Sequence, residues 1–254
     1  MKNRANKIVA WLKNYAEKSG QKAFVVGVSG GVDSALVSTL CAMTGLPTHC
    51  VILPCQTRSG ETDRGRKHIA WLKERYEDVH IHIIDLTSTF EAFEGEVEMG
   101  YDNELGYANA KSRLRMMALY HVACCRGGLV AGTGNKVEDF GIGFFTKYGD
   151  GGVDISPIAH LLKSEVRLMC QALGVLPELA NAVPTDGLWA DGRSDEDAIG
   201  ATYAELEWAM KFIEENTDWQ ILPVTKRQKQ VLEIYTKRHA ATMHKLLPIP
   251  TFQE

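Results

Sequence analysis

The stretch Ser29–Ser34, which reads SGGVDS, most constrains the fold of this chain. It follows the apolar run Phe24–Val28, which predicts a β-strand, and an amphipathic helix is predicted to begin near Asp33. A strand, a tight glycine turn and a helix start aim several backbone N–H groups at one anion, which is typical of a phosphate-binding loop. The stretch matches neither the Walker pattern nor the dinucleotide fingerprint Gly-x-Gly-x-x-Gly, so another nucleotide chemistry is predicted. The alternative is a glycine-rich turn that binds nothing.

Composition indicates a soluble globular protein. The chain has 254 residues, 45% of them hydrophobic, and a formal net charge of -4, which argues against an extensive nucleic-acid-binding surface. The charged N-terminal segment predicts an amphipathic helix rather than a signal peptide, and no run is long enough for a membrane span. The six cysteines form no Cys-x-x-Cys pair and indicate reduced thiols of a cytoplasmic protein. His80 and His82 share one face of a predicted strand, where a structural pair is favoured over a metal site.

The order of apolar runs predicts an α/β fold of one domain, residues 1–254. We expect a doubly wound, mainly parallel five-stranded sheet flanked by helices, because short β-branched runs alternate with helical patterns. Four strands are readable, at Phe24–Val28, Thr48–Leu53, Val79–Ile84 and Leu129–Ala131. Helices are predicted at about 3–18, 33–44, 61–75, 109–125, 158–172, 197–215 and 226–240. In such a sheet a ligand binds at the carboxyl ends of the strands, where Ser29–Ser34 falls, and we expect loops 141–154 and 183–197 to cover it.

A second polar segment, GTGNKVED at 132–139, follows the last of these strands. Thr133 is therefore placed beside the phosphate loop, where it could contact a nucleotide. Asp33 and Glu138 could supply two carboxylates to a magnesium ion whose other ligands are phosphate oxygens. A partner for the helix dipole is the alternative interpretation of Glu138.

The stretch SGGVDS resembles the pyrophosphate-binding loop of the N-type ATP pyrophosphatases, the PP-loop superfamily. Three further segments narrow the resemblance: ANAKSRLRMMALYH at 108–121, GTGNKVEDFGIGFFTKYGDGGVDISPI at 132–158 and MHKLLPIP at 243–250. Together they look like the ammonia-dependent NAD synthetases over nearly the whole chain. The resemblance implies a homodimer with an adenine-nucleotide alpha-hydrolase-like fold, which amidates deamido-NAD with ATP and ammonia. The products would be NAD, AMP and pyrophosphate.

The resemblance also implies roles for individual residues. The family's ATP contacts fall on Gly27, Val28, Ser29, Gly30, Gly31, Val32, Asp33, Ser34, Thr133, Lys163 and Thr185. Its deamido-NAD contacts fall on Arg113, Lys147, Asp154, His244 and Lys245. It places the magnesium ligands at Asp33 and Glu138 and suggests catalytic roles for Asp33, Lys163 and Asp154.

Three of these assignments have alternatives. The alternative for Asp154 is a turn-capping residue before Ile155, Ser156 and Pro157. Many members of the family have one residue fewer between Glu138 and FFTK, so alignment from the right would place the metal ligand at Asp139. We place the metal ligand at Glu138, because its separation from Thr133 along the sequence is fixed. Arg113 and Arg115 flank the apolar stripe of their helix on opposite sides, so only one is expected to face a given pocket. Spacing does not choose between them, and the resemblance selects Arg113.

Free ammonia is the expected nitrogen source, because only one helix precedes the first strand and residue 2 is Lys2. A glutamine-using synthetase would need an amidase domain with a catalytic cysteine. Two other functions remain open. A tRNA-modifying enzyme of the same superfamily would need a basic surface or paired cysteines. A nucleotide-binding sensor would hold ATP without turnover and would not need both Asp33 and Glu138.

Overall fold

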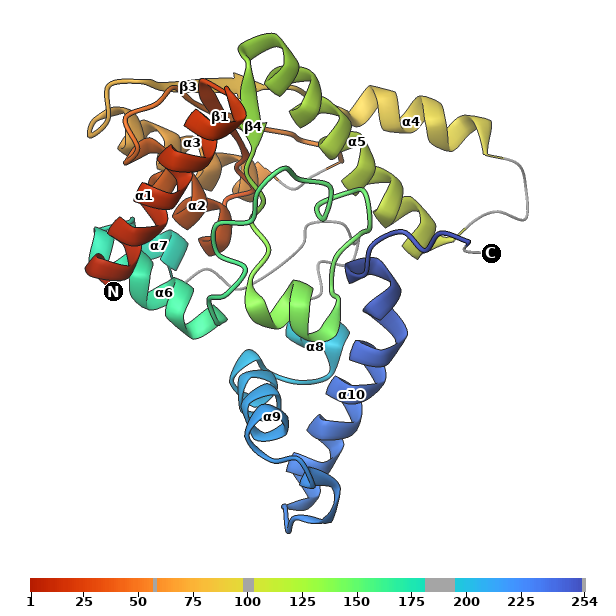
Figure 1. Cartoon of the computed structure of the whole chain (residues 1–254). Helices are drawn as coiled ribbons and strands as arrows, with labels where there is room; N and C mark the ends of the chain where they lie inside the picture. The colour runs from red at the N-terminus through yellow and green to blue at the C-terminus, as the bar shows by residue number, and fades with distance from the viewer. Residues whose placement is uncertain (57–58, 98–102, 181–194, 253–254) are drawn as a thin grey trace.

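A computed structural model describes residues 1–56, 59–97, 103–180 and 195–252. Its sheet has four parallel strands in the order β3-β2-β1-β4 (Figure 1). The strands are β1 (Ala23–Gly27), β2 (Thr48–Ile52), β3 (Val79–Ile83) and β4 (Gly128–Val130). The helices are α1 (Lys2–Ser19), α2 (Val32–Ala42), α3 (Ser59–Lys73), α4 (Thr87–Glu96), α5 (Glu104–Arg126), η1 (Lys136–Ile142), α6 (Lys163–Leu173), α7 (Pro177–Ala180), α8 (Asp195–Ile199), α9 (Tyr203–Glu215), η2 (Trp219–Ile221) and α10 (Lys226–Leu246).

Helices cover both faces of the sheet. Side chains alternate along a strand, so Phe24 and Val26 of β1 enter a core shared with α1, α2, α3 and α6. Val25 and Val51 point the other way, into a core shared with α4 and α5. The predicted parallel α/β fold with helices on both faces is thereby confirmed.

The described part of the sheet has four strands where five were predicted. After β4 the chain touches the sheet again through a single parallel bridge between Ala131 and Ile155. Pro157 follows two residues later and has no N–H group to donate to a neighbouring strand. The segment that could form a fifth strand is therefore reduced to one bridge.

Several predicted helices have other bounds in the structure. Helix α5 begins five residues before the predicted 109, and α10 ends six residues after the predicted 240. The pattern over 197–215 belongs to two helices, α8 and α9, because Gly200 adopts a φ of 87° and Thr202 then caps α9. The helix predicted at 158–172 begins only at Lys163 in the structure. Helix α4 was not predicted. Of the loop predicted at 183–197, the part up to residue 194 lies outside the described residues.

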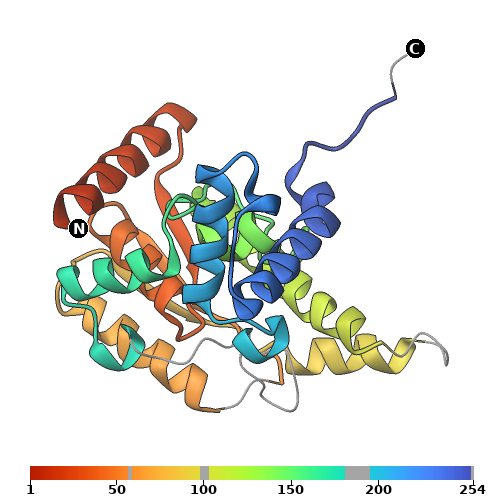
Figure 2. The same cartoon turned by 90° about the horizontal axis from the view of Figure 1, so that it is seen from below.

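A separate lobe is formed by α8, α9 and α10, and it lies below the sheet in Figure 1. Its apolar side chains, among them Leu206, Met210 and Leu232, form a core that also includes Val137 and Ile142 of η1. Figure 2 shows α9 and α10 side by side and the C-terminal segment leaving the end of α10 away from the body. The prediction of one domain over 1–254 stays a prediction.

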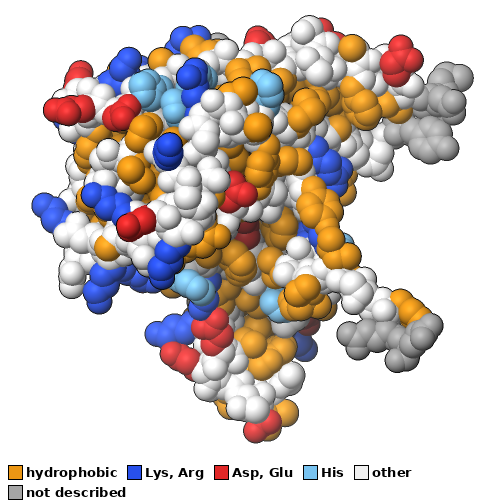
Figure 3. Space-filling model, turned by 45° about the horizontal axis from the view of Figure 1, so that its top comes forward, with side chains coloured by type: hydrophobic (Ala, Val, Ile, Leu, Met, Phe, Trp, Pro, Cys, Tyr) orange, Lys and Arg blue, Asp and Glu red, His pale blue; other side chains and the backbone are white. Residues whose placement is uncertain are grey.

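The surface agrees with the small net charge. On the face drawn in Figure 3, Lys and Arg side chains are interspersed with Asp and Glu side chains. Within the described residues, no helix is both long enough and apolar enough to cross a membrane.

Candidate active site

The loop between β1 and α2 has the conformation that its sequence predicts. Gly30 has a φ of 87°, and a Cβ atom there would lie 2.5 Å from the carbonyl oxygen of Glu61, so only glycine fits without a shift. The Ser34 hydroxyl accepts a hydrogen bond from the Ser29 N–H at 3.2 Å and lies 3.1 Å from the Ser29 hydroxyl. Gly31 is the N-cap residue of α2, so the first N–H groups of that helix lie in the loop.

A cavity of about 780 Å³ opens beside this loop. It lies at the carboxyl ends of β1, β2 and β4, where α/β sheets bind their ligands. The residues of β1 and the loop that line it are Gly27, Val28, Ser29, Gly31, Val32, Asp33 and Ser34. Thr133 and Lys163 line it too. The structure thus brings the described part of the predicted ATP site to one cavity, except that Gly30 faces α3 instead.

Asp33 and Glu138, which are far apart in sequence, meet at one end of this cavity. The Lys163 ammonium group donates to Asp33 Oδ2 at 2.6 Å and to Glu138 Oε1 at 2.8 Å. The Asn135 amide donates to Asp33 Oδ1 at 3.1 Å and to Glu138 Oε2 at 2.6 Å. The Tyr203 hydroxyl donates a further hydrogen bond to Glu138 Oε1. Two carboxylates are therefore held side by side by donors from three parts of the chain.

The charge of Lys163 is stabilised in this position. Its side chain is only 5% exposed, and those of Asp33 and Glu138 are 15% and 14% exposed. Burial alone would lower the pKa of Lys163, but the two carboxylates outweigh it and hold the pKa above its usual value. The two carboxylates therefore favour the charged form of Lys163.

A π-helix, η1, carries both Glu138 and Asp139. Asn135 caps η1, its side-chain oxygen accepting hydrogen bonds from the N–H groups of Val137 and Glu138. The π-helical turn holds one residue more than an α-turn, and both Glu138 and Asp139 line the cavity. Asp139 packs against Gly134, while Glu138 contacts Lys163. Burial, followed by the charges of Asp150 and Glu138, raises the pKa of Asp139 well above its usual value.

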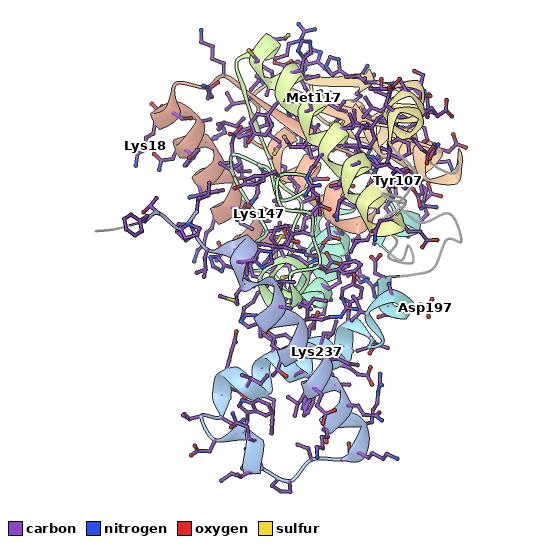
Figure 4. All side chains as sticks on the ribbon, turned by 90° about the vertical axis from the view of Figure 1, so that its right-hand side faces the viewer. Lys18, Tyr107, Met117, Lys147, Asp197 and Lys237 are labelled. Carbon is purple, nitrogen blue, oxygen red and sulfur yellow. The ribbon has the colours of Figure 1, made fainter. Side chains whose placement is uncertain are left out.

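Four of the predicted deamido-NAD residues, Arg113, Lys147, His244 and Lys245, also line this cavity. The Lys147 ammonium group donates to the carbonyl oxygen of His244 at 2.9 Å, and Arg113 Nε donates to the carbonyl oxygen of Lys147 at 3.4 Å. Lys245 donates to the carbonyl oxygens of Gly143 and Phe145 at 2.9 and 2.7 Å. Figure 4 shows Lys147 between α5 and α10, the helices that carry Arg113 and His244.

Some sequence-based expectations differ from this arrangement. Asp154 is exposed and does not line the cavity; its carboxylate accepts hydrogen bonds from the Tyr120 hydroxyl at 3.1 Å and the Val130 N–H at 2.8 Å. The expectation that only one arginine of α5 faces the pocket was wrong, because Arg113 and Arg115 both line it. The cavity extends along α5 and reaches both flanks of its apolar stripe. Thr185 lies outside the described residues.

Sequence reasoning missed two residues that hold the carboxylates. Asn135 stands inside the segment GTGNKVED, and an Asn one residue before a helix is a cap signal that could have singled it out. Tyr203 gives no such signal, because an aromatic residue in the first turn of an amphipathic helix usually joins the core.

The carboxylate pair fits a magnesium ion. Both side chains present oxygen atoms, and a cation already lies between them in the form of Lys163. Among the described residues, no group of three or more His, Cys, Asp or Glu side chains is arranged to hold a metal ion. The two carboxylates would thus need further oxygen ligands, which phosphate groups and water provide for Mg²⁺.

The sheet, its covering helices and the glycine-rich loop at the carboxyl end of β1 make up the PP-loop fold of the ATP pyrophosphatases. The protein is therefore a nucleotide-using enzyme of that class. A model of the NAD synthase family matches residues 4–248. The chain belongs to the NAD synthase family.

Individual relatives agree with this assignment. The NH(3)-dependent NAD(+) synthetase of Syntrophomonas wolfei subsp. wolfei is 40% identical over 209 residues, which cover 80% of this chain and 81% of that protein. The enzyme of the same description from Alkaliphilus metalliredigens is 35% identical over 256 residues and 97% of both chains. Among solved structures, the NMN synthetase from Francisella tularensis has a TM-score of 0.88 and 31% identity, covering 100% of this chain and 98% of that one.

Proposed function

We propose that this protein amidates deamido-NAD with ammonia at the expense of ATP and releases NAD, AMP and pyrophosphate. The observation that carries the proposal is one cavity that is lined both by the phosphate-binding loop and by several basic residues. Its described cations are Arg64, Arg113, Arg115, Lys147, Lys163, Arg238 and Lys245. Family membership supports the same conclusion.

The chemistry needs positive charge more than it needs a protein nucleophile. The nicotinate carboxylate attacks the α-phosphorus of ATP, the bond to pyrophosphate breaks, and ammonia then attacks the acyl carbon and releases AMP. Two anions must approach each other in the first step, so cations that neutralise the developing charge supply most of the acceleration. Lys163, beside the loop, and Lys147, one of the predicted deamido-NAD residues, are suited to this role.

The assignments of Asp33, Lys163 and Glu138 remain part of the proposal. Asp33 and Glu138 would hold Mg²⁺, which supplies charge neutralisation on the phosphates when bound. The contacts of Glu138 with Lys163 and Asn135 support Glu138 rather than Asp139 as the second ligand. For Asp154, the contacts with Tyr120 and Val130 support a role in fixing the segment after the Gly-rich loop.

We also propose a cytoplasmic enzyme that takes free ammonia and acts as a homodimer. Four of the six cysteines are buried and none forms a disulfide, which suits a reducing compartment. The relatives described as NH(3)-dependent NAD(+) synthetases support free ammonia as the nitrogen source.

A second acceptor is favoured by one specific observation. The solved structure with a TM-score of 0.88 is that of an NMN synthetase. The corresponding reaction would amidate nicotinate mononucleotide, which carries the same carboxylate without the adenylate half. The adenylation chemistry at Asp33, Lys163 and the loop would be unchanged, so only the acceptor differs.

The test is incubation of the purified protein with ATP, Mg²⁺ and ammonium, with either deamido-NAD or nicotinate mononucleotide as acceptor. We expect AMP and NAD in equal amounts and a higher kcat/KM for deamido-NAD. A higher kcat/KM for the mononucleotide would establish the second acceptor. ATP binding without AMP formation from either acceptor would contradict both and indicate a nucleotide sensor.

A matched pair of variants connects the activity to this cavity. Asp33→Asn should lower kcat at least about 100-fold because one of the two proposed Mg²⁺ carboxylates, at the wall of the cavity, is lost. Asp63→Asn, at an exposed position on α3, should leave kcat unchanged. Equal activities of the two variants would remove Asp33 from the site.

A further inference from the structure

Tyr203 reaches from the helical lobe into the charged cluster. Its side chain is buried, its hydroxyl donates to Glu138 Oε1, and the same oxygen lies 3.2 Å from Asp195 Oδ2. The centre of its ring is 4.8 Å from the ammonium nitrogen of Lys163. Tyr203 therefore touches both the proposed metal carboxylate and the cation beside it.

The donors around the two carboxylates are not equivalent. Lys163 and Asn135 each donate to both Asp33 and Glu138. Tyr203, in contrast, donates to Glu138 and makes no hydrogen bond to Asp33 among the described residues. If Lys163 turns toward an ATP phosphate, as its proposed role requires, Glu138 loses one of its donors. Tyr203 and Asn135 would then keep its carboxylate in place.

The backbone of Tyr203 is fixed on several sides. Thr202 caps α9 and forms a capping box with Glu205, whose carboxylate is paired with Arg227 of α10 at 2.7 Å. The Tyr203 N–H donates to Glu196 of α8 at 2.8 Å. Three helices of the lobe thus determine where the hydroxyl lies, so it can orient Glu138 without rearrangement.

The hydroxyl is separable from the rest of the side chain. The ring packs in the core of the lobe, where phenylalanine would pack as well. The oxygen instead points at two carboxylates, and a buried hydroxyl without a use in packing is costly unless it is hydrogen-bonded. A purely structural role would therefore need the ring but not the oxygen.

We propose that Tyr203 is a positioning residue that orients the Glu138 carboxylate for Mg²⁺ bound with ATP. The inference rests on the ATP and magnesium part of the proposed function and is independent of which acceptor is amidated. Through Tyr203, helix α9 of the lobe is connected to the proposed metal site.

The experiment measures Mn²⁺ binding to the whole protein in complex with a non-hydrolysable ATP analogue, by electron paramagnetic resonance of free Mn²⁺. In Tyr203→Phe we expect the Mn²⁺ Kd to rise about 10-fold or more, which is typical when a residue that hydrogen-bonds to a metal ligand is substituted. The affinity for the analogue without metal should stay the same. In turnover, the Mg²⁺ concentration for half-maximal rate should rise while the KM of the acceptor is unchanged.

Two comparisons separate positioning from a general effect on the lobe. Tyr235→Phe removes a hydroxyl from the same core, at a ring that stacks on His239, and should leave the Mn²⁺ Kd unchanged. In a Glu138→Gln background, Tyr203→Phe should add no further loss of Mn²⁺ affinity, because the two residues act through one contact.

The proposal is overturned if Tyr203→Phe binds Mn²⁺ within twofold of the unmodified protein, or if Tyr235→Phe weakens it equally. Failure of the complex of unmodified protein and analogue to bind Mn²⁺ would overturn it as well. Failure of the amidation assay with intact Mn²⁺ binding would contradict only the proposed reaction, so the two failures are distinguishable.

Discussion

His68 is a buried histidine whose surroundings admit only its neutral form. The Ser38 hydroxyl donates to the Ser34 carbonyl oxygen at 2.7 Å, so His68 Nε2 is the donor to Ser38 Oγ at 2.9 Å. Its other ring nitrogen, Nδ1, is buried and has no hydrogen-bond partner among the described residues. A proton on Nδ1 would place an uncompensated charge in the core, and burial accordingly lowers the pKa of His68 from 6.5 to about 4.

Stability should therefore fall on acidification, starting below neutral pH. The unfolded chain takes up the proton near pH 6.5 and the folded chain only near pH 4, so protonation favours unfolding in this window. Between pH 6.5 and 5, protonation of His68 in the unfolded chain should lower the unfolding free energy by up to about 2 kcal/mol. Urea unfolding at several pH values measures it. His68→Gln should flatten the pH dependence, whereas His160→Gln, at an exposed position, should not. Equal slopes in all three proteins would contradict the assignment.

Residues of the site differ in how far the sequence reveals them. Thr133 lies in the segment after β4, and Asp33 lies in the first turn of α2 after the loop that follows β1. The rule that ligands bind at carboxyl strand ends was therefore enough to place both at one cavity. Tyr203 enters the site only because α9 packs against η1, a contact between distant segments that no local pattern reports. The position of Asp154 likewise involves a distant segment, because its carboxylate accepts a hydrogen bond from Tyr120 of α5.

At the scale of elements, periodic patterns predicted most helices and missed the special ones. Both η1 and the break between α8 and α9 deviate from a period of 3.6 residues, one by an extra residue in the turn and one by a glycine with positive φ. The π-helical turn of η1 was not predicted, because it depends on the space that Gly134 leaves for the Asp139 side chain.

Gly134 and Asp139 form the contact that makes η1 possible. A Cβ atom at Gly134 would overlap the Asp139 carboxylate, so Gly134→Ala must displace Asp139 or unwind the turn. We expect Gly134→Ala to lower the unfolding free energy by about 1–3 kcal/mol, as for other overpacked sites. Asp139→Ala in the same chain should restore most of it, because the clashing carboxylate is removed. Thermal and urea unfolding measure both.

The control for this prediction is a glycine in open space. A Cβ atom added at Gly95 of α4 would have no neighbouring atom within 4 Å, so Gly95→Ala should be neutral or stabilise by up to about 1 kcal/mol. If Gly134→Ala is as harmless as Gly95→Ala, the packing of Asp139 against Gly134 does not constrain the π-helix.

For the whole molecule, the sequence predicted the two-faced sheet better than the lobe. The strands read as continuous apolar runs because both faces are covered, and this is a strong local signal. The lobe has its own core of residues from η1, α9 and α10, whose helices were predicted individually. Their assembly over one end of the cavity depends on long-range packing, which one sequence does not specify.

The segment after α10 points to a contact with a second copy of the chain. Leu247, Ile249 and Phe252 are 55%, 69% and 89% exposed, and the segment extends away from the body (Figure 2). Exposed apolar side chains in a row are a common sign of an interface.

We therefore expect the proposed homodimer to have twice the chain mass of 28.1 kDa in light scattering. Removal of residues 247–254 should weaken dimerisation at least about tenfold. Ile221→Ser, at an equally exposed apolar position on the tip of the lobe, should not change it. A monomeric full-length protein would contradict the homodimer, and an unaltered dimer of the shortened chain would place the interface elsewhere.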